Sequence, residues 1–141
     1  MQILIRQLDT PELQDILPLA ADLNPGIQTE VLAERLKQMI QCGNYYCAGG
    51  FLDNKLIAVG GYWIATKFYC GRYIELDNIA VEPEYRSLGI GKQLIAWLEA
   101  EGKRQSCDVA ILDAYTTNTR AHSFYKNAGY KILGHHFLKE I

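Results

Sequence analysis

Two glycines two residues apart follow an arginine in the stretch YRSLGIGKQL, residues 85–94, directly before an apolar helical run. Glycines let a backbone approach a bound group closely, and the N–H groups at the start of a helix attract an anion. Arg86 and Lys92 add side chains that form charge-assisted hydrogen bonds to phosphate. The stretch therefore predicts a loop that holds phosphate.

Two common phosphate-binding motifs do not fit this stretch. The dinucleotide motif Gly-x-Gly-x-x-Gly needs a third glycine where the chain has Leu94, and this turn does not follow the N-terminal strand of a βαβ pair. The loop of ATP- and GTP-binding proteins needs glycine where the chain has Arg86, and serine or threonine where it has Gln93. A plain glycine-rich turn that caps a helix is the remaining alternative.

Two carboxylates are candidates for proton transfer. Glu75 and Asp77 lie two residues apart in a segment rich in β-formers, so they share one strand face where no bulge intervenes. Neighbouring carboxylates repel each other, which favours protonation of one of them and suits a general base that works near neutral pH. A solvated or ion-paired acid on a strand is the alternative for both residues.

The elements that position these residues follow from apolar periodicity. We expect strands at 3–8, 45–52, 56–68, 72–81, 109–115 and 130–138. We expect a helix capped by Thr10 with Pro11 at its first position, helices that begin at Thr29 and at 89, and a last helix capped by Asn118 or Thr117. Early strands follow one another directly and later strands are separated by helices, which predicts a mixed sheet flanked by helices in an α/β fold of the α+β kind.

Individual residues refine this expectation. Pro18 predicts a kink or an early end of the first helix near Leu17. Gly102 is expected to follow the helix over 89–101. The apolar run Val109 to Tyr115 predicts a central strand buried on both faces. A bulge is expected near Asp77-Asn78, because both residues are poor β-formers.

Composition narrows the class of protein. The chain has 141 residues, of which 49% are hydrophobic and 21% charged, and we treat residues 1–141 as one domain. A net charge of -2 argues against a nucleic-acid-binding protein. The sequence lacks a signal peptide and a run of about 20 apolar residues, so we expect no membrane contact and a cytoplasmic location. The four cysteines form no Cys-x-x-Cys and lie far from the histidines, so we expect no metal.

Two motifs resemble those of a known family. The pattern Arg86-x-x-Gly89-x-Gly91, after a strand and Glu82-Pro83, resembles the pyrophosphate loop of the GNAT superfamily of acyl-CoA-dependent N-acetyltransferases. The family's second signature, about thirty residues downstream, is similar to Asn118, Ala121, Phe124-Tyr125-Lys126 and Gly129-Tyr130. The order of elements resembles that fold over the whole chain. The resemblance implies a central mixed β-sheet of six to seven strands flanked by about four helices.

The resemblance also implies acetyl-CoA as cosubstrate, no metal, and roles for particular residues. The cofactor-binding residues that it implies are Ile79, Ala80, Val81, Arg86, Ser87, Leu88, Gly89, Ile90, Gly91, Lys92, Asn118, Phe124 and Tyr125. The backbone of 79–81 would meet the pantetheine arm, and an N–H near Ile79 would stabilise the oxyanion. Tyr125 would protonate the departing thiolate. Asn118 is equally well explained as a helix cap.

The general base is open between two carboxylates. Glu75 has the spacing at which some histone-acetylating members carry a catalytic glutamate, and Asp77 is the alternative, with or without a bridging water. His135 and His136 are weaker candidates for the acceptor pocket. Four aromatic residues are weaker still, because aromatic residues on strands usually pack; they are Tyr62, Trp63, Tyr69 and Tyr73.

The resemblance implies an N-acetyltransferase that moves an acetyl group from acetyl-CoA to a primary amine of a small molecule or peptide, by direct attack in a ternary complex. The alternatives are a non-catalytic acyl-CoA-binding sensor domain and a protein lysine acetyltransferase. The pocket for the amine acceptor is expected to be shaped by residues 22–31 and by the hairpin and C-terminal loops, whose conformation the sequence leaves open. Pairing of two chains through C-terminal strands, giving a homodimer, is common in the family.

Overall fold

The order of strands and helices along the chain is largely as expected. The computed structural model describes residues 2–141 and forms two units, one ending at Ile111 and one running from Leu112 to Ile141. The elements are β1 (Leu4–Gln7), η1 (Thr10–Ile16), α1 (Leu17–Leu23), α2 (Thr29–Gln41), β2 (Tyr45–Leu52), β3 (Lys55–Lys67), β4 (Gly71–Val81), η2 (Pro83–Tyr85), α3 (Ile90–Arg104), β5 (Val109–Leu112) and α4 (Thr119–Asn127). The elements η1 and η2 are 3₁₀-helices.

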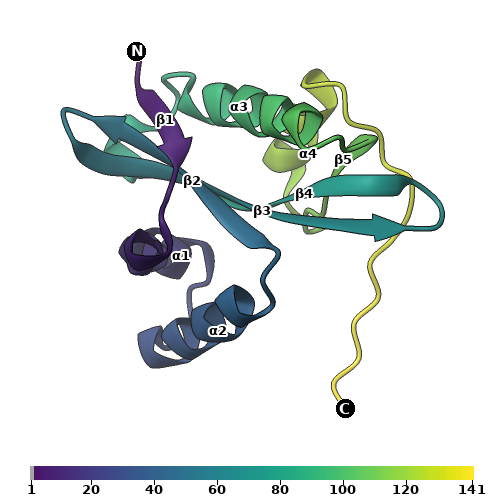
Figure 1. The fold of residues 1–141 in the computed structure, drawn as a ribbon, viewed down its shortest axis with the longest axis horizontal. Coiled ribbons are helices and arrows are strands. Elements are labelled where there is room, and N and C mark those ends of the chain that lie inside the picture. Colours follow the sequence, from purple (N-terminus) through teal and green to yellow (C-terminus); the bar gives the residue numbers. More distant parts are fainter. Residues whose placement is uncertain (1) are drawn as a thin grey trace. The chain divides into compact units, whose positions relative to one another are not determined.

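One open sheet carries the fold. Over residues 2–141 it has five strands in the order β1-β2-β3-β4-β5 (Figure 1). Strands β1 to β4 pair antiparallel with their neighbours. The predicted α/β class is confirmed, but the predicted count of six to seven strands is wrong.

The missing strand is the one predicted over 130–138. These residues have no regular secondary structure, and Leu133 and Phe137 are 82% and 92% exposed. The apolar residues there fall in adjacent pairs, Ile132 with Leu133 and Phe137 with Leu138, so they break the two-residue alternation of a half-buried strand. Gly134 between the pairs weakens strand formation further.

The first helical segment changes type at the predicted proline. The 3₁₀-helix η1 ends at Ile16, and α1 begins at Leu17 with Pro18 in its first turn, where a missing N–H leaves no bond unmade. The predicted break near Leu17 is therefore confirmed. The predicted cap is wrong by one residue, because the N-cap of η1 is Asp9 and Thr10 is its first helical residue.

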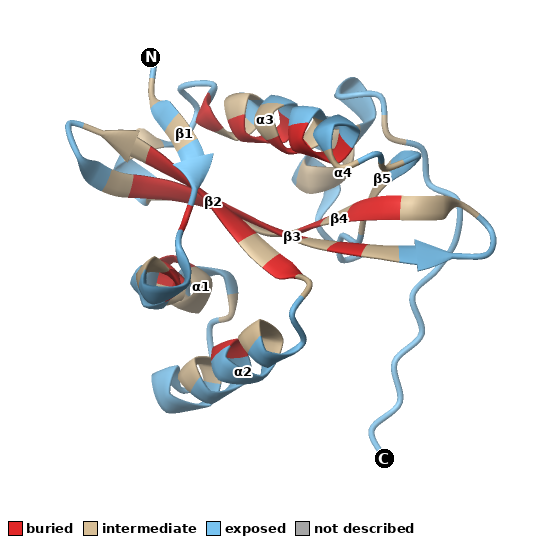
Figure 2. Cartoon of the chain, in the orientation of Figure 1, coloured by how far each residue is buried: buried red, intermediate tan, exposed pale blue. Residues whose placement is uncertain are grey.

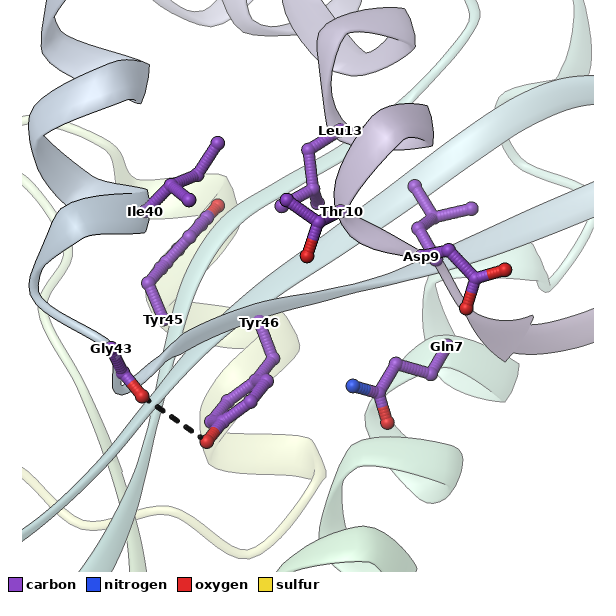
Figure 3. Close-up of a pocket in the computed structure, with 9 residues that line it drawn as sticks. Gln7, Asp9, Thr10, Leu13, Ile40, Gly43, Tyr45 and Tyr46 are labelled. Atoms are coloured by element: carbon purple, nitrogen blue, oxygen red, sulfur yellow. Dashed lines mark hydrogen bonds between the residues drawn. The ribbon is translucent and has the colours of Figure 1, made fainter.

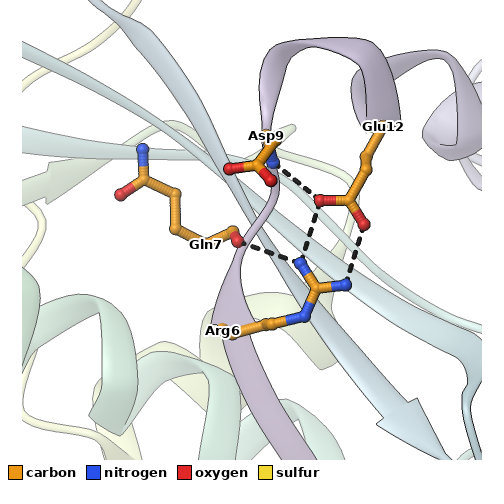
Figure 4. Close-up of polar contacts among 4 residues, drawn as sticks. All are labelled: Arg6, Gln7, Asp9 and Glu12. Carbon is orange, nitrogen blue, oxygen red and sulfur yellow. Dashed lines mark hydrogen bonds and ion pairs between the residues drawn. The ribbon is translucent and has the colours of Figure 1, made fainter.

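An ion pair ties β1 to the start of η1. Arg6 Nη1 and Nη2 donate to the Glu12 carboxylate at 2.9 and 2.8 Å, and the Asp9 backbone N–H donates to Glu12 Oε1 at 2.8 Å (Figure 4). The hydrogen bonds from Arg6 and from the Asp9 backbone hold the pKa of Glu12 at about 2. The same carboxylate thus fixes the strand and the first turn of the helix.

Helices cover both faces of the sheet in the first unit. Helices α1 and α2 lie on one face and α3 lies on the other (Figure 1), and the buried residues of β2, β3 and α3 concentrate between them (Figure 2). The core on the α1 and α2 side includes Leu36, Cys47 and Val59. Burial raises the pKa of the Cys47 thiol to about 12. No helix within residues 2–141 has the length and apolar character needed to cross a membrane.

Two expectations about the C-terminal half of the first unit are wrong. Gly102 lies inside α3, which runs on to Arg104. A Cβ at Gly102 would come within 2.7 Å of Ile74 Cγ2, so glycine lets the helix pack closely on β4. Strand β5 is last in the sheet order rather than central, and Val109 is exposed while the other three residues are half-buried. An apolar run can therefore mark a partly buried strand at the end of a sheet.

Candidate active site

A β-bulge interrupts β4 where the sequence predicts one. Val59 pairs with Ala80 and Gly61 pairs with Asp77, so one residue of β3 opposes two residues of β4, at 78–79. Asn78 has a φ of 53°, a left-handed conformation that asparagine tolerates better than most residues. The bulge is confirmed, and it turns the backbone of β4 two residues before the strand ends.

The two candidate carboxylates share one face of β4 just before the bulge. Glu75 pairs with Trp63 and Asp77 pairs with Gly61 in an unbroken register, so both side chains lie on the same face, as predicted. Both residues are half-buried. Trp63 Nε1 donates a hydrogen bond to Asp77 Oδ2 at 3.0 Å. An indole N–H therefore occupies one oxygen of the Asp77 carboxylate.

The residues after the bulge pack on both faces of the sheet. Ala80 is buried with the core on the α1 and α2 side. Ile79 and Val81 pack against the opposite core, which includes Ile90 and Leu94 of α3. Their side chains therefore serve the core, and only their backbone groups are left for the role that the sequence assigns to them.

The glycine-rich loop runs from the end of η2 to the start of α3. Its exposed residues 86–89 include Ser87 with a φ of 64° and Gly89 with a φ of 82°. Gly89 is the N-cap of α3 and offers no side-chain cap, and a Cβ built on it would meet no atom within 4 Å. Arg86 Nε donates to the carbonyl of Val81 at 3.0 Å, which joins the loop to the end of β4.

This loop fits a diphosphate. The fifteen-residue helix α3 directs its dipole and its first-turn N–H groups toward the loop, and its N-cap residue brings no carboxylate or hydroxyl of its own. Lys92 is exposed in the first turn, so its ammonium is accessible to an anion. Ile90 is 1% exposed and anchors the helix start in the core. A helix end anchored in the core thus adjoins an exposed, glycine-rich loop whose residues could hold an anion.

The remaining predicted site residues lie in the second unit. Asn118 is the N-cap of α4, and its side-chain oxygen accepts from the N–H of Ala121 at 3.1 Å, so its capping role is established. Tyr125 is half-buried, and its ring meets Phe124 and Tyr130 edge to face, with centroids 5.2 and 5.9 Å apart. Burial raises the pKa of the Tyr125 phenol, which keeps the hydroxyl protonated at neutral pH.

The histidine and aromatic candidates for the acceptor pocket lie in different parts of the structure. His136 Nδ1 lies 3.2 Å from Asp113 Oδ2 in the second unit. Tyr62 is fully buried against Trp97 of α3, with ring centroids 6.3 Å apart, so it packs on the face opposite to Glu75. Tyr69 is 68% exposed at the turn between β3 and β4.

A cavity of about 260 Å³ lies beside the start of β2 (Figure 3). Gln7, Asp9 and Thr10 line one side, and Tyr45 and Tyr46 line another. None of its lining residues comes from β4 or from the glycine-rich loop. The cavity therefore contains none of the residues that the sequence assigns to catalysis or to cofactor binding.

Sequence reasoning missed two residues that shape the bulge. Gly61 of β3 pairs with Asp77, directly before the bulge. Tyr45 of β2 contacts the bulge itself, because Asn78 Nδ2 donates to Tyr45 Oη at 3.5 Å. The signal was the glycine pair at positions 60 and 61 inside a strand, since glycine within a strand often marks a bulge or a close approach of backbones.

The open sheet, the bulge in β4 and the glycine-rich loop before α3 agree with an acyltransferase, the class that the sequence resemblance implies. Residues 13–130 match the Acetyltransferase (GNAT) family, and the chain belongs to this family. It is 30% identical over 110 residues to glucosamine 6-phosphate N-acetyltransferase 1 of Dictyostelium discoideum, a match that covers 74% of this chain and 68% of that protein.

Two further comparisons describe its similarity to other acetyltransferases. The chain is 33% identical over 67 residues to aminoalkylphosphonate N-acetyltransferase of Salmonella typhimurium, and this match covers 48% of the chain and 44% of that protein. Among solved structures, the aminoglycoside N-acetyltransferase AAC(6')-Iy, in complex with a CoA-linked bisubstrate analogue, has a TM-score of 0.84 at 21% identity. That likeness covers 100% of this chain and 99% of the other, and it shows the fold.

Proposed function

We propose that the protein transfers an acetyl group from acetyl-CoA to a primary amine by direct attack in a ternary complex. The glycine-rich loop is the observation that carries this proposal, because its positive-φ backbone and open surroundings suit a diphosphate at the start of α3. The solved relative AAC(6')-Iy holds CoA or a CoA-linked analogue, which supports the choice of cosubstrate.

The residues that would hold the cosubstrate fall into three groups. The diphosphate would be bound by the loop residues Arg86, Ser87, Leu88, Gly89, Ile90, Gly91 and Lys92. The pantetheine arm would be bound by the backbone of Ile79, Ala80 and Val81. Further contacts to the cosubstrate would come from Asn118, Phe124 and Tyr125. The bound thioester supplies an activated acyl group. Backbone N–H groups suit this binding, because the side chains of 79–81 are already used in the core.

Three groups of the chain would move protons or stabilise charge. Glu75 would accept the proton of the acceptor ammonium, since only the neutral amine has a free lone pair. The backbone N–H near Ile79 would donate to the developing oxyanion. Tyr125 would donate its phenolic proton to the departing thiolate, a role that suits a hydroxyl whose pKa is raised by burial. Asp77 is the alternative base.

The acceptor that we propose is a small cationic amine. Glu75 and Asp77 place two carboxylates on one face of β4, and their negative charge attracts an ammonium group. The curated relatives carry names of enzymes that acetylate glucosamine 6-phosphate, aminoalkylphosphonates and thialysine, all of which are small amines.

The test is a screen of amines with acetyl-CoA, in which release of the CoA thiol reports turnover. Turnover of small amines with no turnover of lysine-containing peptides supports the proposal. Turnover of peptides only would identify a protein lysine acetyltransferase. Binding of acetyl-CoA by calorimetry without turnover on any amine would identify a sensor domain and overturn the catalytic proposal.

We also propose that two chains pair through their C-terminal segments in the cytoplasm. Leu133, Phe137 and Leu138 are each more than four-fifths exposed, and burial of such side chains against a second copy would be favourable. The four free thiols suit a reducing compartment. Sedimentation of the full chain tests the pairing, and a monomer at all accessible concentrations would overturn it.

A further inference from the structure

Two aromatic side chains from neighbouring strands hold the two residues that lead into the bulge of β4. Tyr45 of β2 and Trp63 of β3 are register partners, with ring centroids 4.8 Å apart and planes tilted by 53°. Trp63 Nε1 donates to Asp77 Oδ2 at 3.0 Å, and Asn78 Nδ2 donates to Tyr45 Oη at 3.5 Å. We call Tyr45 and Trp63 the aromatic bracket, because each holds one of two consecutive residues of β4.

The bracket fits because residue 61 is glycine. A Cβ on Gly61 would overlap Tyr45 Oη and would lie 2.9 Å from the carbonyl oxygen of Asp77. Tyr45 is 5% exposed, and burial raises the pKa of its phenol, so the hydroxyl stays protonated. The phenol, the glycine and the bulge therefore form one closely packed unit.

The bulge needs such support from its surroundings. Asn78 has a φ of 53°, a conformation that costs free energy in residues other than glycine, although asparagine tolerates it better than most, so neighbouring groups help to hold it. The bulge determines where the N–H of Ile79 points, because Ile79 is the second of the two residues opposite Gly60. A change in the bracket is therefore transmitted to the backbone directly after Asn78.

We infer that Tyr45 and Trp63 are positioning residues for acyl transfer, which fix the bulge of β4 and with it the direction of the Ile79 N–H and of the Asp77 carboxylate. The inference rests on the proposed function, in which that N–H stabilises the oxyanion. Neither aromatic residue needs to touch a reacting atom. A misplacement of about 1 Å in such a donor lowers the rate by roughly 100-fold, so small shifts are measurable.

Conservative variants separate positioning from packing. Trp63→Phe removes the indole N–H and keeps an aromatic ring, and Tyr45→Phe removes only the hydroxyl. We expect each to lower kcat roughly 10-fold, while the dissociation constant for CoA stays within about two-fold, because the glycine-rich loop is unchanged. Tyr46→Phe is the matched control, since its hydroxyl donates to the Gly43 carbonyl at 3.4 Å and its ring meets Tyr62 on the opposite face. This control should keep the wild-type kcat.

A second measurement does not depend on turnover. In ¹H–¹⁵N spectra of the full chain, the amide resonances of Asn78 and Ile79 should shift in Trp63→Phe and in Tyr45→Phe, and should stay in place in Tyr46→Phe. An inactive wild-type protein would overturn the proposed function and leave this test intact. Unchanged kcat or unmoved resonances in both bracket variants would overturn the inference, as would an equal loss of CoA affinity and kcat.

Discussion

The loop at 86–91 and the bulge at 78–79 adjoin the same end of β4, yet they are held in different ways. The loop takes its path from positive φ angles, and a Cβ on Gly89 would meet no atom within 4 Å. At the bulge, by contrast, a Cβ on Gly61 would overlap the hydroxyl of Tyr45. The loop is thus shaped by its own backbone and is open, whereas the bulge is set by packing from two other strands.

This difference separates binding from reaction. An open loop with exposed N–H groups can accept a charged group from solvent without moving the core. A packed bulge can hold a hydrogen-bond donor in a fixed direction, which matters where charge develops during a reaction. Substitutions in the loop should therefore change the affinity for CoA, and substitutions near the bulge should change kcat.

The largest expected effect is at the reacting end. Glu75→Gln should lower kcat by roughly 100-fold or more, because an amide cannot accept the proton of the acceptor ammonium. Affinity for CoA, measured by calorimetry, should stay within about two-fold of wild type. Glu84→Gln makes the same change at an exposed acid that pairs with Lys55, and it should keep the wild-type kcat. Undiminished turnover in Glu75→Gln would transfer the role of base to Asp77 or to water.

A comparable effect on binding is expected at the loop. Gly89→Asp should raise the dissociation constant for CoA roughly 100-fold, because its carboxylate would repel the diphosphate and its side chain would stand in the approach to the backbone. Gly43→Asp is a matched control, since Gly43 has nearly the same φ, 79° against 82°, and a Cβ there also meets nothing within 4 Å. Both variants should lose about 1 kcal/mol of stability, seen by thermal melting. Equal CoA affinities would refute the assignment of the loop.

A smaller effect on turnover is expected in the second unit. Tyr125→Phe should lower kcat roughly 10-fold and leave CoA affinity nearly unchanged, because the ring contacts remain and only the phenolic proton is lost. Tyr115→Phe, at a tyrosine that is 81% exposed, should behave as wild type. Steady-state kinetics with a saturating amine measures both. A Tyr125→Phe enzyme with full kcat would remove this hydroxyl from the mechanism.

The smallest effect is on stability, away from both regions. The pKa of Glu12 is lowered from 4.5 to about 2 in the folded protein, so its ion pair with Arg6 stabilises the fold above pH 4.5 and loses this effect as pH falls toward 2. The melting temperature of wild type should therefore exceed that of Glu12→Gln at pH 6, with a gap that narrows by pH 2 and with added salt. A gap that does not depend on pH would contradict the role of the ion pair.

Features set by neighbouring residues were predictable from the sequence. The glycine-rich loop, the break at Pro18 and the cap at Asn118 each depend on backbone preferences within a few residues. The bulge was predictable too, because Asp77 and Asn78 are poor β-formers in an otherwise favourable strand. These features agree with the structure because nothing distant in the chain opposes them.

Features set by distant partners were not predictable. Gly102 looks like a helix end until Ile74 is known to pack against it, and the Tyr45 hydroxyl has no local signal that ties it to Asn78. The position of β5 at the end of the sheet is a further case, because its apolar run is equally compatible with a central strand. Tertiary packing decides such cases, and a single sequence does not list its contacts.

The burial of Cys47 affects assays that detect released CoA with thiol-reactive dyes. Thiol-reactive dyes label the thiolate, and with a pKa of about 12 almost none of Cys47 is ionised at pH 8, whereas Cys42 is exposed. In an assay that measures released CoA with such a dye, the exposed thiol of Cys42 would react quickly and give a background signal, whereas the buried thiol of Cys47 would contribute almost none. Slow labelling of the Cys47 thiol would then report unfolding of the core, so one reagent could follow both product formation and unfolding.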